Sequence, residues 1–434
     1  MLFERPDAGE RAVLVHLDLI HEAEREDPRE FEELVLSAGG DPVAFIGGQR
    51  SSPNPRYFVG SGKLEEIRLQ VRQQEAELVL FNHALSPSQE RNLESELQCR
   101  VLDRTGLILD IFAQRARTHE GKLQVELAQL QHMSTRLVRG WTHLERQKGG
   151  IGLRGPGETQ LESDRRLLRA RIKLISKRLD KVRKQRNQGR RARRRAHIPT
   201  VSLVGYTNAG KSTLFNVLTE SDVYTADQLF ATLDPTFRRI LIPDLGPVVL
   251  ADTVGFIRHL PHKLIEAFRA TLEEAAQSDL LIHVIDCADQ GRADNIAQVE
   301  AVLKEIGADS IPRLEVYNKV DLLEAPARID RDQADVPRRV WLSAKQQQGL
   351  SLLLETLAEW LCNDLIHGCL TLQADQGRLR AAFYQQGVVV SEHYNDQGLS
   401  VLDIRVPRQD FCRLVSAEDL DPETALAGMK SVNS

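Results

Sequence analysis

The chain has 434 residues and a formal net charge of −5; 27% of its residues are charged and 41% are hydrophobic. This length exceeds one ordinary domain, and the composition is typical of a soluble globular protein. No apolar run reaches the roughly 18 residues of a membrane-spanning helix, the N-terminus lacks a secretory signal pattern, and the five cysteines contain no CxxC pair. These features argue against stable membrane insertion, a disulfide framework or a zinc site, and they predict a cytoplasmic protein.

Residues 1–115 alternate strand-like and helix-like patterns and are expected to form an N-terminal α/β domain. Strands are predicted at 12–17, 43–46, 78–81 and 100–102, and helices at 30–38, 64–74 and 86–97. Strands that alternate with helices indicate a largely parallel sheet.

Two short motifs of this region each allow two interpretations. Residues 60–63, Gly-Ser-Gly-Lys, resemble a phosphate-binding loop, but Tyr57 stands where that motif needs its first glycine. A turn before the next helix is therefore preferred, and a second nucleotide site is the alternative. Asp103, Arg104 and Thr105 follow a strand, and they either contribute to a site or form a salt-bridged turn.

Residues 116–197 show the pattern of a long antiparallel helical hairpin. Apolar residues recur every three or four positions between Leu123 and Leu144, and a second stripe runs from Leu161 to Val182. Between the stripes, residues 148–160 contain five glycines and a proline, which predicts a non-helical tip. Residues 187–199 are expected to be a basic, poorly ordered linker.

The charge of this region is strongly polarised. Residues 165–195 contain 16 Lys or Arg and one acidic residue, Asp180, so the rest of the chain must carry a net charge of −20. A solvated helix face usually mixes the two signs of charge, whereas this segment does not. A nucleic-acid partner is therefore the preferred interpretation, and a solvated surface is the alternative.

Residues 198–365 contain the motifs with the most specific spacing. An apolar strand at 201–204 runs into residues 205–212, which have the form GxxxxGKS, and a helix follows at 213–218. In this context the backbone N–H groups of the loop and the helix N-terminus bind phosphate groups. Lys211 is predicted to contact the β- and γ-phosphates, and the Ser212 hydroxyl is predicted to bind Mg²⁺.

A second apolar strand leads into Asp252-Thr-Val-Gly255. Asp252 is expected to hold Mg²⁺ through water, and the Gly255 N–H is expected to contact the γ-phosphate. A threonine between the two motifs should also bind Mg²⁺. The segment 230–236, Phe-Ala-Thr-Leu-Asp-Pro-Thr, offers Thr232 as the preferred ligand and Thr236 as the alternative.

The motif Asn318-Lys-Val-Asp321 predicts which base is bound. The Asp321 carboxylate is suited to accept two parallel hydrogen bonds from N1 and the 2-amino group of guanine, and adenine has neither donor. Lys319 is expected to lie over the purine ring and Asn318 to tie this loop to the phosphate loop. The backbone of Ser343-Ala-Lys345 is expected to contact the guanine O6.

These motifs together define the candidate nucleotide site. Its residues are Gly205, Tyr206, Thr207, Asn208, Ala209, Gly210, Lys211, Ser212, Thr213, Phe230, Ala231, Thr232, Leu233, Asp234, Asp252, Thr253, Val254, Gly255, Asn318, Lys319, Val320, Asp321, Ser343, Ala344 and Lys345. Lys211, Thr232 and Gly255 are the predicted catalytic residues, and Ser212 and Thr232 are the predicted metal ligands.

Phe256 directly follows the Asp252-Thr-Val-Gly255 motif, at the place where many GTPases carry a glutamine that orients the attacking water. Phenylalanine is unable to do this, so intrinsic hydrolysis should be slow, or depend on another group or on a partner. Asn208 either helps to hold K⁺ beside the phosphates, as a second cofactor after Mg²⁺, or only caps the loop. Both interpretations of Asn208 stay open.

Residues 366–434 are expected to form a small C-terminal α+β domain. A helix is predicted at 374–385, and strands at 388–394 and 399–406 flank Asn395-Asp-Gln-Gly398, which is a hairpin signature. A last helix is predicted at 408–415, and the tail after about Asp421 is expected to be loose.

The sequence resembles the HflX-type GTPases of the translation-factor-like class over nearly its whole length. The resemblance is carried by GYTNAGKST, FATLDPT, DTVGFIRHLP, NKVD and SAK, preceded by GGIGLRGPGETQLESDRR, YFVGSGKLEEI and VLDRTGLILDIFAQRA. The glycine-rich segment directly before the GTPase motifs is the most specific of these features, whereas the GTPase motifs alone fit many families.

This resemblance implies a multidomain α/β protein that hydrolyses GTP to GDP and binds the large ribosomal subunit in a GTP-linked manner, in translation, ribosome splitting or ribosome biogenesis. Ribosomal RNA is the expected partner of the basic hairpin, with Lys148 and Arg154 as its leading contacts. A monomer is expected, because the two apolar stripes of the hairpin satisfy each other. The alternative is an RNA-modification or RNA-remodelling NTPase that does not act on ribosomes.

Overall fold

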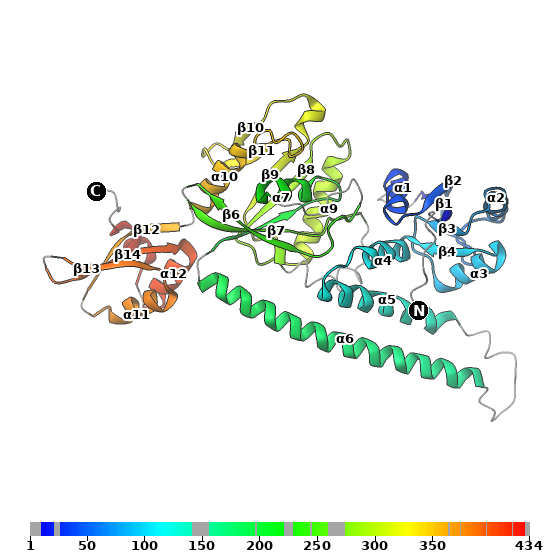
Figure 1. The fold of residues 1–434 in the computed structure, drawn as a ribbon, viewed down its shortest axis with the longest axis horizontal. Helices are drawn as coiled ribbons and strands as arrows, with labels where there is room; N and C mark the ends of the chain where they lie inside the picture. The colour runs from blue at the N-terminus through cyan, green and yellow to red at the C-terminus, as the bar shows by residue number, and fades with distance from the viewer. Residues whose placement is uncertain are drawn as a thin grey trace.

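The computed structural model describes most of the chain. The described residues are 10–20, 27–140, 156–195, 198–220, 229–243, 245–258, 274–362, 365–373, 375–395, 397–418 and 420–429. They form three β-sheets with helices packed on them, and one long helix runs beneath the central and N-terminal sheets in the view of Figure 1. Among the described helices, none has both the length and the apolar character that crossing a bilayer requires.

The N-terminal sheet is parallel throughout, as the alternating pattern predicts, with strand order β2-β1-β3-β4. Its strands are β1 (Arg11–Leu19), β2 (Asp41–Arg50), β3 (Leu78–Phe81) and β4 (Arg100–Asp103), and its helices are α1 (Pro28–Ser37), α2 (Ser61–Gln73), α3 (Pro87–Leu97) and α4 (Arg104–Arg115). Three of these helices begin with a side-chain cap: Asp27 accepts from the Arg29 N–H at α1, Ser86 and Gln89 form a capping box at α3, and Asp103 accepts from the Gly106 N–H at α4.

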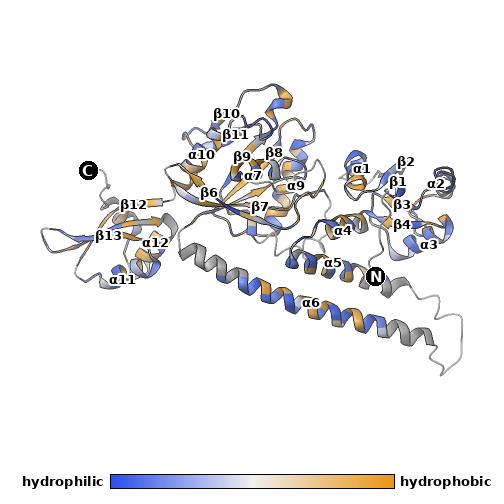
Figure 2. Cartoon of the chain, viewed as in Figure 1, coloured by the Kyte–Doolittle hydropathy of each residue, from blue (hydrophilic) through white to orange (hydrophobic). Residues whose placement is uncertain are grey.

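Helices α5 (His119–Gly140) and α6 (Pro156–Arg195) lie side by side. Val125 and Ala128 of α5 and Ile175 of α6 are buried, and Arg171 of α6 donates to Glu126 of α5 at 2.7 Å. Figure 2 shows hydrophilic and hydrophobic bands alternating along α6, as expected of an amphipathic helix. We refer to these two helices as the helix pair.

Helix α6 is longer than the sequence analysis predicts at both ends. It has 40 residues, so it is about 60 Å long. It begins at Pro156, within the segment assigned to the tip, because proline lacks only an N–H that is unpaired in the first turn anyway. It continues through residues 187–195, which were assigned to a poorly ordered linker. This expectation is wrong because arginine and alanine are strong helix formers and outweigh the single Gly189. Residues 141–155, including Lys148 and Arg154, lie outside the described residues.

The central sheet has strand order β10-β11-β9-β8-β5-β7-β6. Its strands are β5 (Thr200–Val204), β6 (Thr236–Ile242), β7 (Gly246–Asp252), β8 (Leu280–Asp286), β9 (Arg313–Asn318), β10 (Arg328–Arg331) and β11 (Pro337–Trp341). The two edge strands, β6 and β10, are antiparallel to their neighbours, and the five inner strands are parallel. The helices of this region are α7 (Lys211–Thr219), α9 (Arg292–Glu305), α10 (Leu350–Cys362) and the short 3₁₀ helix η1 (Val320–Leu323).

The C-terminal sheet has order β12-β14-β13 and is antiparallel, and its β13–β14 hairpin confirms the predicted one. Its elements are β12 (Leu365–Leu372), α11 (Gly377–Gln386), β13 (Val389–Tyr394), β14 (Ser400–Pro407), α12 (Arg408–Ser416) and α13 (Pro422–Ala427). The expectation of a loose tail after Asp421 is wrong as far as Met429, because Asp421 caps α13 by accepting from the Thr424 N–H at 3.0 Å.

One hydrophobic core joins the N-terminal region to the central region. It includes Ile108 and Phe112 of α4 and Val125 of α5, together with Phe230 and Phe256 from the two sequence motifs around the candidate site. All five side chains are almost fully buried. The N-terminal region therefore packs directly against the segments that surround the candidate site.

Candidate nucleotide site

The GxxxxGKS loop, residues 205–212, connects the carboxyl end of β5 to the first turn of α7. Gly210 has φ +92°, and a Cβ at this position would lie 2.2 Å from Asn318 Nδ2, so only glycine fits there. Asn318 in turn donates from Nδ2 to the carbonyl of Ala209 at 2.9 Å and accepts from the Ala344 N–H at 2.9 Å. The predicted link between the loop of Asn318 and the phosphate loop is thus present.

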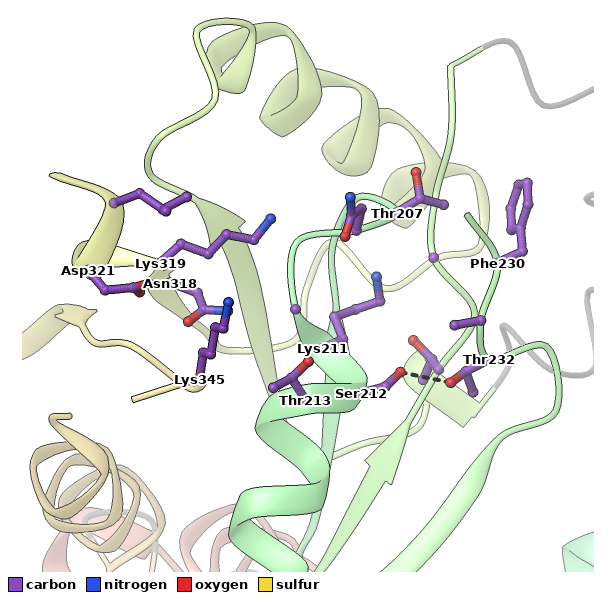
Figure 3. Close-up of a pocket in the computed structure, with 16 residues that line it drawn as sticks. Thr207, Lys211, Ser212, Thr213, Phe230, Thr232, Asn318, Lys319, Asp321 and Lys345 are labelled. Carbon is purple, nitrogen blue, oxygen red and sulfur yellow. Dashed lines mark hydrogen bonds between the residues drawn. The ribbon is translucent and has the colours of Figure 1, made fainter. Parts of the chain in front are cut away.

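A cavity of about 450 Å³ opens above this loop. It is lined by Thr207, Asn208, Gly210, Lys211, Ser212, Thr213, Phe230, Ala231, Thr232, Thr253, Gly255, Asn318, Lys319, Asp321, Leu322 and Lys345. In Figure 3, Lys211, Ser212 and Thr232 lie at one end, and Lys319, Asp321 and Lys345 lie at the other. The residues predicted to bind the phosphates and those predicted to bind the base therefore lie at opposite ends of one cavity, which we call the phosphate end and the base end.

Lys211 is buried at the phosphate end and donates from Nζ to the Tyr206 carbonyl at 2.6 Å. Burial lowers its pKa to about 8, and the Asp252 carboxylate opposes that shift. An anionic ligand in the cavity would favour the charged ammonium group. This lysine is accordingly suited to neutralise phosphate charge.

Three oxygen-bearing side chains meet beside Lys211. The hydroxyls of Ser212 and Thr232 donate to Asp252 Oδ2 at 2.8 and 2.9 Å and lie 2.7 Å from each other. Asp252 is fully buried, and its other oxygen, Oδ1, has no hydrogen-bond partner among the described residues. Hard oxygen ligands with an unpaired carboxylate oxygen fit Mg²⁺, and the ion would supply charge neutralisation for a bound triphosphate.

The structure also separates the two threonine candidates for Mg²⁺. Thr232 lines the cavity and contacts Ser212. Thr236 instead begins β6, where it pairs in register with Asp252, and it is not among the residues that line the cavity. The geometry therefore favours Thr232, which stays a predicted ligand.

The base end agrees with guanine recognition. Asp321 Oδ1 is shielded from solvent and has no hydrogen-bond partner among the described residues, so it is free to accept from a ligand. Lys319 has a left-handed backbone (φ 69°), and its ammonium group forms an ion pair with Asp286 at 2.7 Å. Leu322 also lines the cavity, and no spacing rule pointed to it.

Several predicted site residues do not line the cavity. Leu233, Val254 and Val320 are buried in hydrophobic clusters, and Ser343 is fully buried. Gly205, Ala209 and Ala344 contribute backbone contacts around the loop, and Asp252 lies behind Ser212. Phe256 is 2% exposed within the shared core, which explains why this position carries no polar side chain.

Asp234 has a different partner from the predicted one. Its carboxylate accepts from the backbone N–H groups of Arg117 and Thr118, both at 2.8 Å, and from the Thr118 hydroxyl at 2.6 Å. A Cβ on Gly121 would lie 1.9 Å from Asp234 Oδ1, so the approach requires glycine there. The segment of residues 229–236, which we call switch I, is thus bonded to the start of α5. The sequence holds no local signal for this contact, which joins residues 116 and 117 positions apart.

Comparisons with known proteins agree with this site. Three family models match the chain: "GTP-binding GTPase N-terminal" at residues 25–113, "GTP-binding GTPase Middle Region" at 115–193 and "50S ribosome-binding GTPase" at 200–319. A GTP-binding protein from the archaeon Sulfolobus solfataricus, solved in complex with GDP, aligns at 26% identity and a TM-score of 0.45. That alignment covers 82% of this chain and 99% of that one.

Two curated relatives cover most of the chain. GTPase HflX of Escherichia coli (strain K12) is 60% identical over 418 residues, which are 96% of this chain and 98% of the relative. GTPase HflX of Caldanaerobacter subterraneus subsp. tengcongensis is 46% identical over 393 residues, 90% of each chain. The resemblance seen in the motifs is confirmed over nearly the whole length: this chain belongs to the HflX family of GTPases, and it is a GTP-hydrolysing enzyme.

Proposed function

We propose that this GTPase binds the large ribosomal subunit in its GTP-bound state and acts in translation, ribosome splitting and recycling, or ribosome biogenesis. The observation that carries the proposal is the exposed basic face of α6. The family description of a 50S ribosome-binding GTPase, which matches residues 200–319, supports the same partner.

Helix α6 presents its positive charges to solvent. The exposed basic residues of its described side chains are Arg166, Arg169, Arg171, Lys173, Lys177, Arg178, Lys181 and Lys184. Ile172, Ile175 and Leu179 lie between them in the sequence but are turned away, buried or half-buried. A row of cations on a rigid helix is suited to contact the phosphates of ribosomal RNA, because each contact releases condensed counterions.

Asp234 supplies a physical link between the nucleotide and this helix pair. It lies two residues after Thr232, whose hydroxyl would bind Mg²⁺ beside the γ-phosphate, and it is bonded to the start of α5. Ordering of switch I by GTP would therefore fix the start of α5, and loss of the γ-phosphate would release it. This gives GTP a means to set the orientation of α5 and α6.

Hydrolysis itself rests on positioned charge. Lys211 and the Gly255 N–H lie where the γ-phosphate would develop charge in the transition state. Because Phe256 is buried away from the cavity, no side chain at that position orients water. Asn208 lines the cavity and stays the candidate for placing K⁺ beside the phosphates.

Co-sedimentation with purified large subunits tests the proposal. We expect more protein to bind with a non-hydrolysable GTP analogue than with GDP. Changing Arg166, Arg169, Lys173 and Lys177 together to Gln should weaken binding and flatten its salt dependence. The matched control changes four exposed cations elsewhere, Arg72, Arg238, Arg239 and Lys304, and should leave the salt slope unaltered.

Two outcomes would contradict the proposal. Equal binding in the GTP and GDP states would remove the nucleotide dependence, and an unchanged salt slope in the α6 variant would make the basic face a solvated surface. Nucleotide-independent binding to ribosome-free RNA would favour the alternative, an RNA-modification or RNA-remodelling NTPase.

Asp234→Ala should keep subunit binding but lose its dependence on GTP, because the start of α5 then has no bond to switch I.

A further inference from the structure

Two charged side chains of the N-terminal region reach into the nucleotide-binding region. Glu30 of α1 accepts a hydrogen bond from the hydroxyl of Tyr206, the second residue of the phosphate loop. Arg104, the first residue of α4, forms an ion pair with the same carboxylate. The side chains of Arg104 and Glu30 are only 5% and 10% exposed, so water competes little for either group.

Both backbone polar groups of Arg258 are held by this cluster. The Arg258 N–H donates to the Tyr206 hydroxyl at 2.9 Å, and the Arg258 carbonyl accepts from Arg104 Nη2 at 3.2 Å. Burial, together with the Glu30 carboxylate, raises the pKa of Tyr206 above its usual range, so the hydroxyl stays neutral. It donates to Glu30 while it accepts from Arg258. We call Glu30, Arg104, Tyr206 and the Arg258 backbone the clamp.

Arg258, whose backbone the clamp holds, lies three residues after Gly255, the predicted contact of the γ-phosphate. Residues 252–258, which we call switch II, are also held against the phosphate loop by bonds from the Thr207 N–H to the Phe256 carbonyl at 2.7 Å and from the Phe256 N–H to the Gly205 carbonyl at 3.1 Å. A Cβ on Gly255 would lie 3.1 Å from Lys211 Nζ. The Arg258 contacts therefore extend a set of bonds that fixes the Gly255 N–H beside Lys211.

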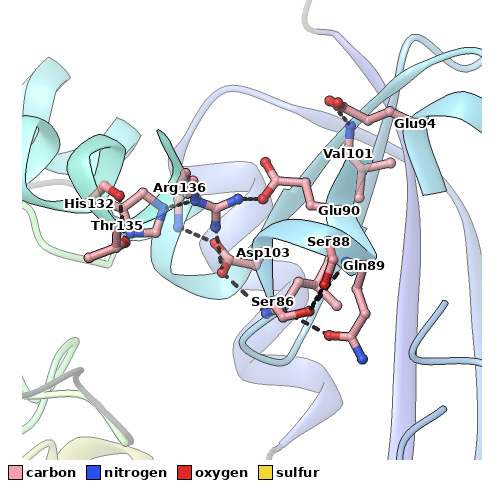
Figure 4. Close-up of polar contacts among 12 residues, drawn as sticks. Ser86, Ser88, Gln89, Glu90, Glu94, Val101, Asp103, His132, Thr135 and Arg136 are labelled. Carbon is pink, nitrogen blue, oxygen red and sulfur yellow. Dashed lines mark hydrogen bonds and ion pairs between the residues drawn. The ribbon is translucent and has the colours of Figure 1, made fainter. Parts of the chain in front are cut away.

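Arg104 is itself held in place from several sides. Its Nη1 donates to Asn82 Oδ1 at 2.8 Å. Its neighbour Asp103 caps α4 and accepts from Arg136 Nη2 of α5 at 2.9 Å, and Arg136 also pairs with Glu90 and donates to His132 (Figure 4). The guanidinium group of Arg104 is thus part of a rigid support rather than a mobile surface charge.

We propose that Glu30 and Arg104 are positioning residues for GTP hydrolysis, which act from outside the nucleotide-binding region by holding switch II through Tyr206 and the Arg258 backbone. Groups that stabilise a transition state contribute most when they are fixed in advance, and small displacements reduce the rate steeply. The Asp103–Arg104 motif is therefore more than the salt-bridged turn that the sequence allows.

A purely structural role is the competing explanation. Buried ion pairs often contribute little net stability, and breaking one leaves an uncompensated charge. A structural role predicts that clamp variants lose thermal stability, nucleotide affinity and turnover together. A positioning role predicts a lower kcat while KM and GDP affinity stay constant, because the ground-state contacts of the nucleotide are left in place.

The test uses three conservative variants of the full chain without ribosomes, so its outcome does not depend on the proposed partner. Tyr206→Phe removes only the hydroxyl. Glu30→Gln leaves one acceptor oxygen where two are needed, and Arg104→Lys keeps the charge but lacks the planar fork of donors that spans the three acceptors of Arg104. Glu32→Gln, an exposed position on the same helix, is the matched control.

We expect kcat for intrinsic GTP hydrolysis to fall about tenfold or more in each clamp variant, with KM and the affinity for a fluorescent GDP within about twofold of the unmodified protein. The control should retain full activity. Glu30→Gln combined with Tyr206→Phe should lose less activity than the product of the two single losses, since both variants break the hydrogen bond between Tyr206 and Glu30. An unchanged or raised kcat in folded Tyr206→Phe would overturn the proposal, as would a loss of kcat that follows melting temperature and GDP affinity. If Glu30→Gln or Arg104→Lys fails to fold, Tyr206→Phe decides the question.

Discussion

The N-terminal and central sheets differ in what lies at the carboxyl ends of their parallel strands. In both sheets the carboxyl ends of the parallel strands meet at one edge, and open α/β sheets bind ligands outside these carboxyl ends. At the central sheet, the edge carries a glycine-containing loop and a cavity of about 450 Å³. At the N-terminal sheet, Asn82 and His83 follow β3 and His16 lies within β1; all three are at most 8% exposed, and His16 contacts both of the others.

The difference teaches that backbone loops, not sheet topology, determine which edge is able to accept a nucleotide. The N-terminal edge uses its own side chains: Asn82 contacts His16 and accepts from Arg104, and His83 accepts from the Leu17 N–H at 3.2 Å. The Gly-Ser-Gly-Lys motif forms the first turn of α2, and Lys63 pairs with Glu66 at 2.7 Å. The preferred interpretation of that motif as a turn fits this geometry.

The largest expected contrast is between the two lysines. Lys211→Ala removes the buried cation of the phosphate end and should lower GTP hydrolysis by about 1,000-fold or more, which is roughly 4 kcal/mol. Lys63→Ala removes a half-buried cation at the other sheet and should leave the rate unchanged. Steady-state phosphate release measures both, and an inactive Lys63→Ala variant with an intact fold would overturn the comparison.

A second contrast concerns the buried histidines His83 and His283, one in each region. Burial, assisted by His16, lowers the pKa of His83 to about 4, from 6.5. Above pH 6.5 the His83 imidazole is neutral in both the folded and the unfolded chain, so it does not change the free energy of unfolding. As the pH falls towards 4 the unfolded chain binds the proton first, so the free energy of unfolding should fall by about 3 kcal/mol. Below pH 4 this loss should level off.

Region-resolved hydrogen exchange measures this effect. Amides of β1 and β3 should lose protection between pH 6.5 and 4, and His83→Gln should reduce the loss. Burial lowers the pKa of His283 in β8 further, to about 3, so amides of β8 and β9 should continue to lose protection below pH 4. Loss of protection over one common pH range in both sheets would mean that the two regions unfold as one unit.

Two aspartates at strand ends give the third contrast. Asp321→Asn should weaken GTP binding by about 100-fold and shift preference towards xanthosine triphosphate, because the amide is unable to accept both guanine donors. Asp103→Asn preserves a helix cap at the N-terminal sheet and should keep guanine specificity. Competition binding with the two nucleotides measures the shift. Full GTP affinity in Asp321→Asn would remove this residue from base recognition.

The smallest expected effect separates the two interpretations of Asn208. Its backbone is left-handed (φ 58°), which asparagine tolerates, so the residue type alone is explained by the turn. Asn208→Gly keeps that backbone and removes the amide. If the amide places a cation, K⁺ should raise the hydrolysis rate about tenfold over Na⁺, and the variant should lose the difference. Equal rates in both salts for the unmodified protein would leave Asn208 with only a capping role.

The nucleotide motifs could be predicted because their geometry is local. GxxxxGKS between a strand and a helix places Lys211 and Ser212 through backbone constraints within a few residues, and Asn318 reaches Ala209 as expected. The fold class of the N-terminal region followed from the alternation of its patterns. The two ends of α6 could not be predicted in this way, because the cost of a glycine or a proline to helix stability depends on its position in the helix.

What the sequence by itself determined is which helix is basic and which residues are predicted to carry the chemistry of the site: the loop that should hold phosphates and the carboxylate that should recognise the base. Only the tertiary structure decided how that site is supported. Tyr206 meets Glu30 from 176 positions away, Arg258 meets Arg104 from 154, and Asp234 meets Thr118 from 116. No spacing or periodicity encodes such contacts, because they arise from the burial of one hydrophobic core shared by the N-terminal region and both switch segments.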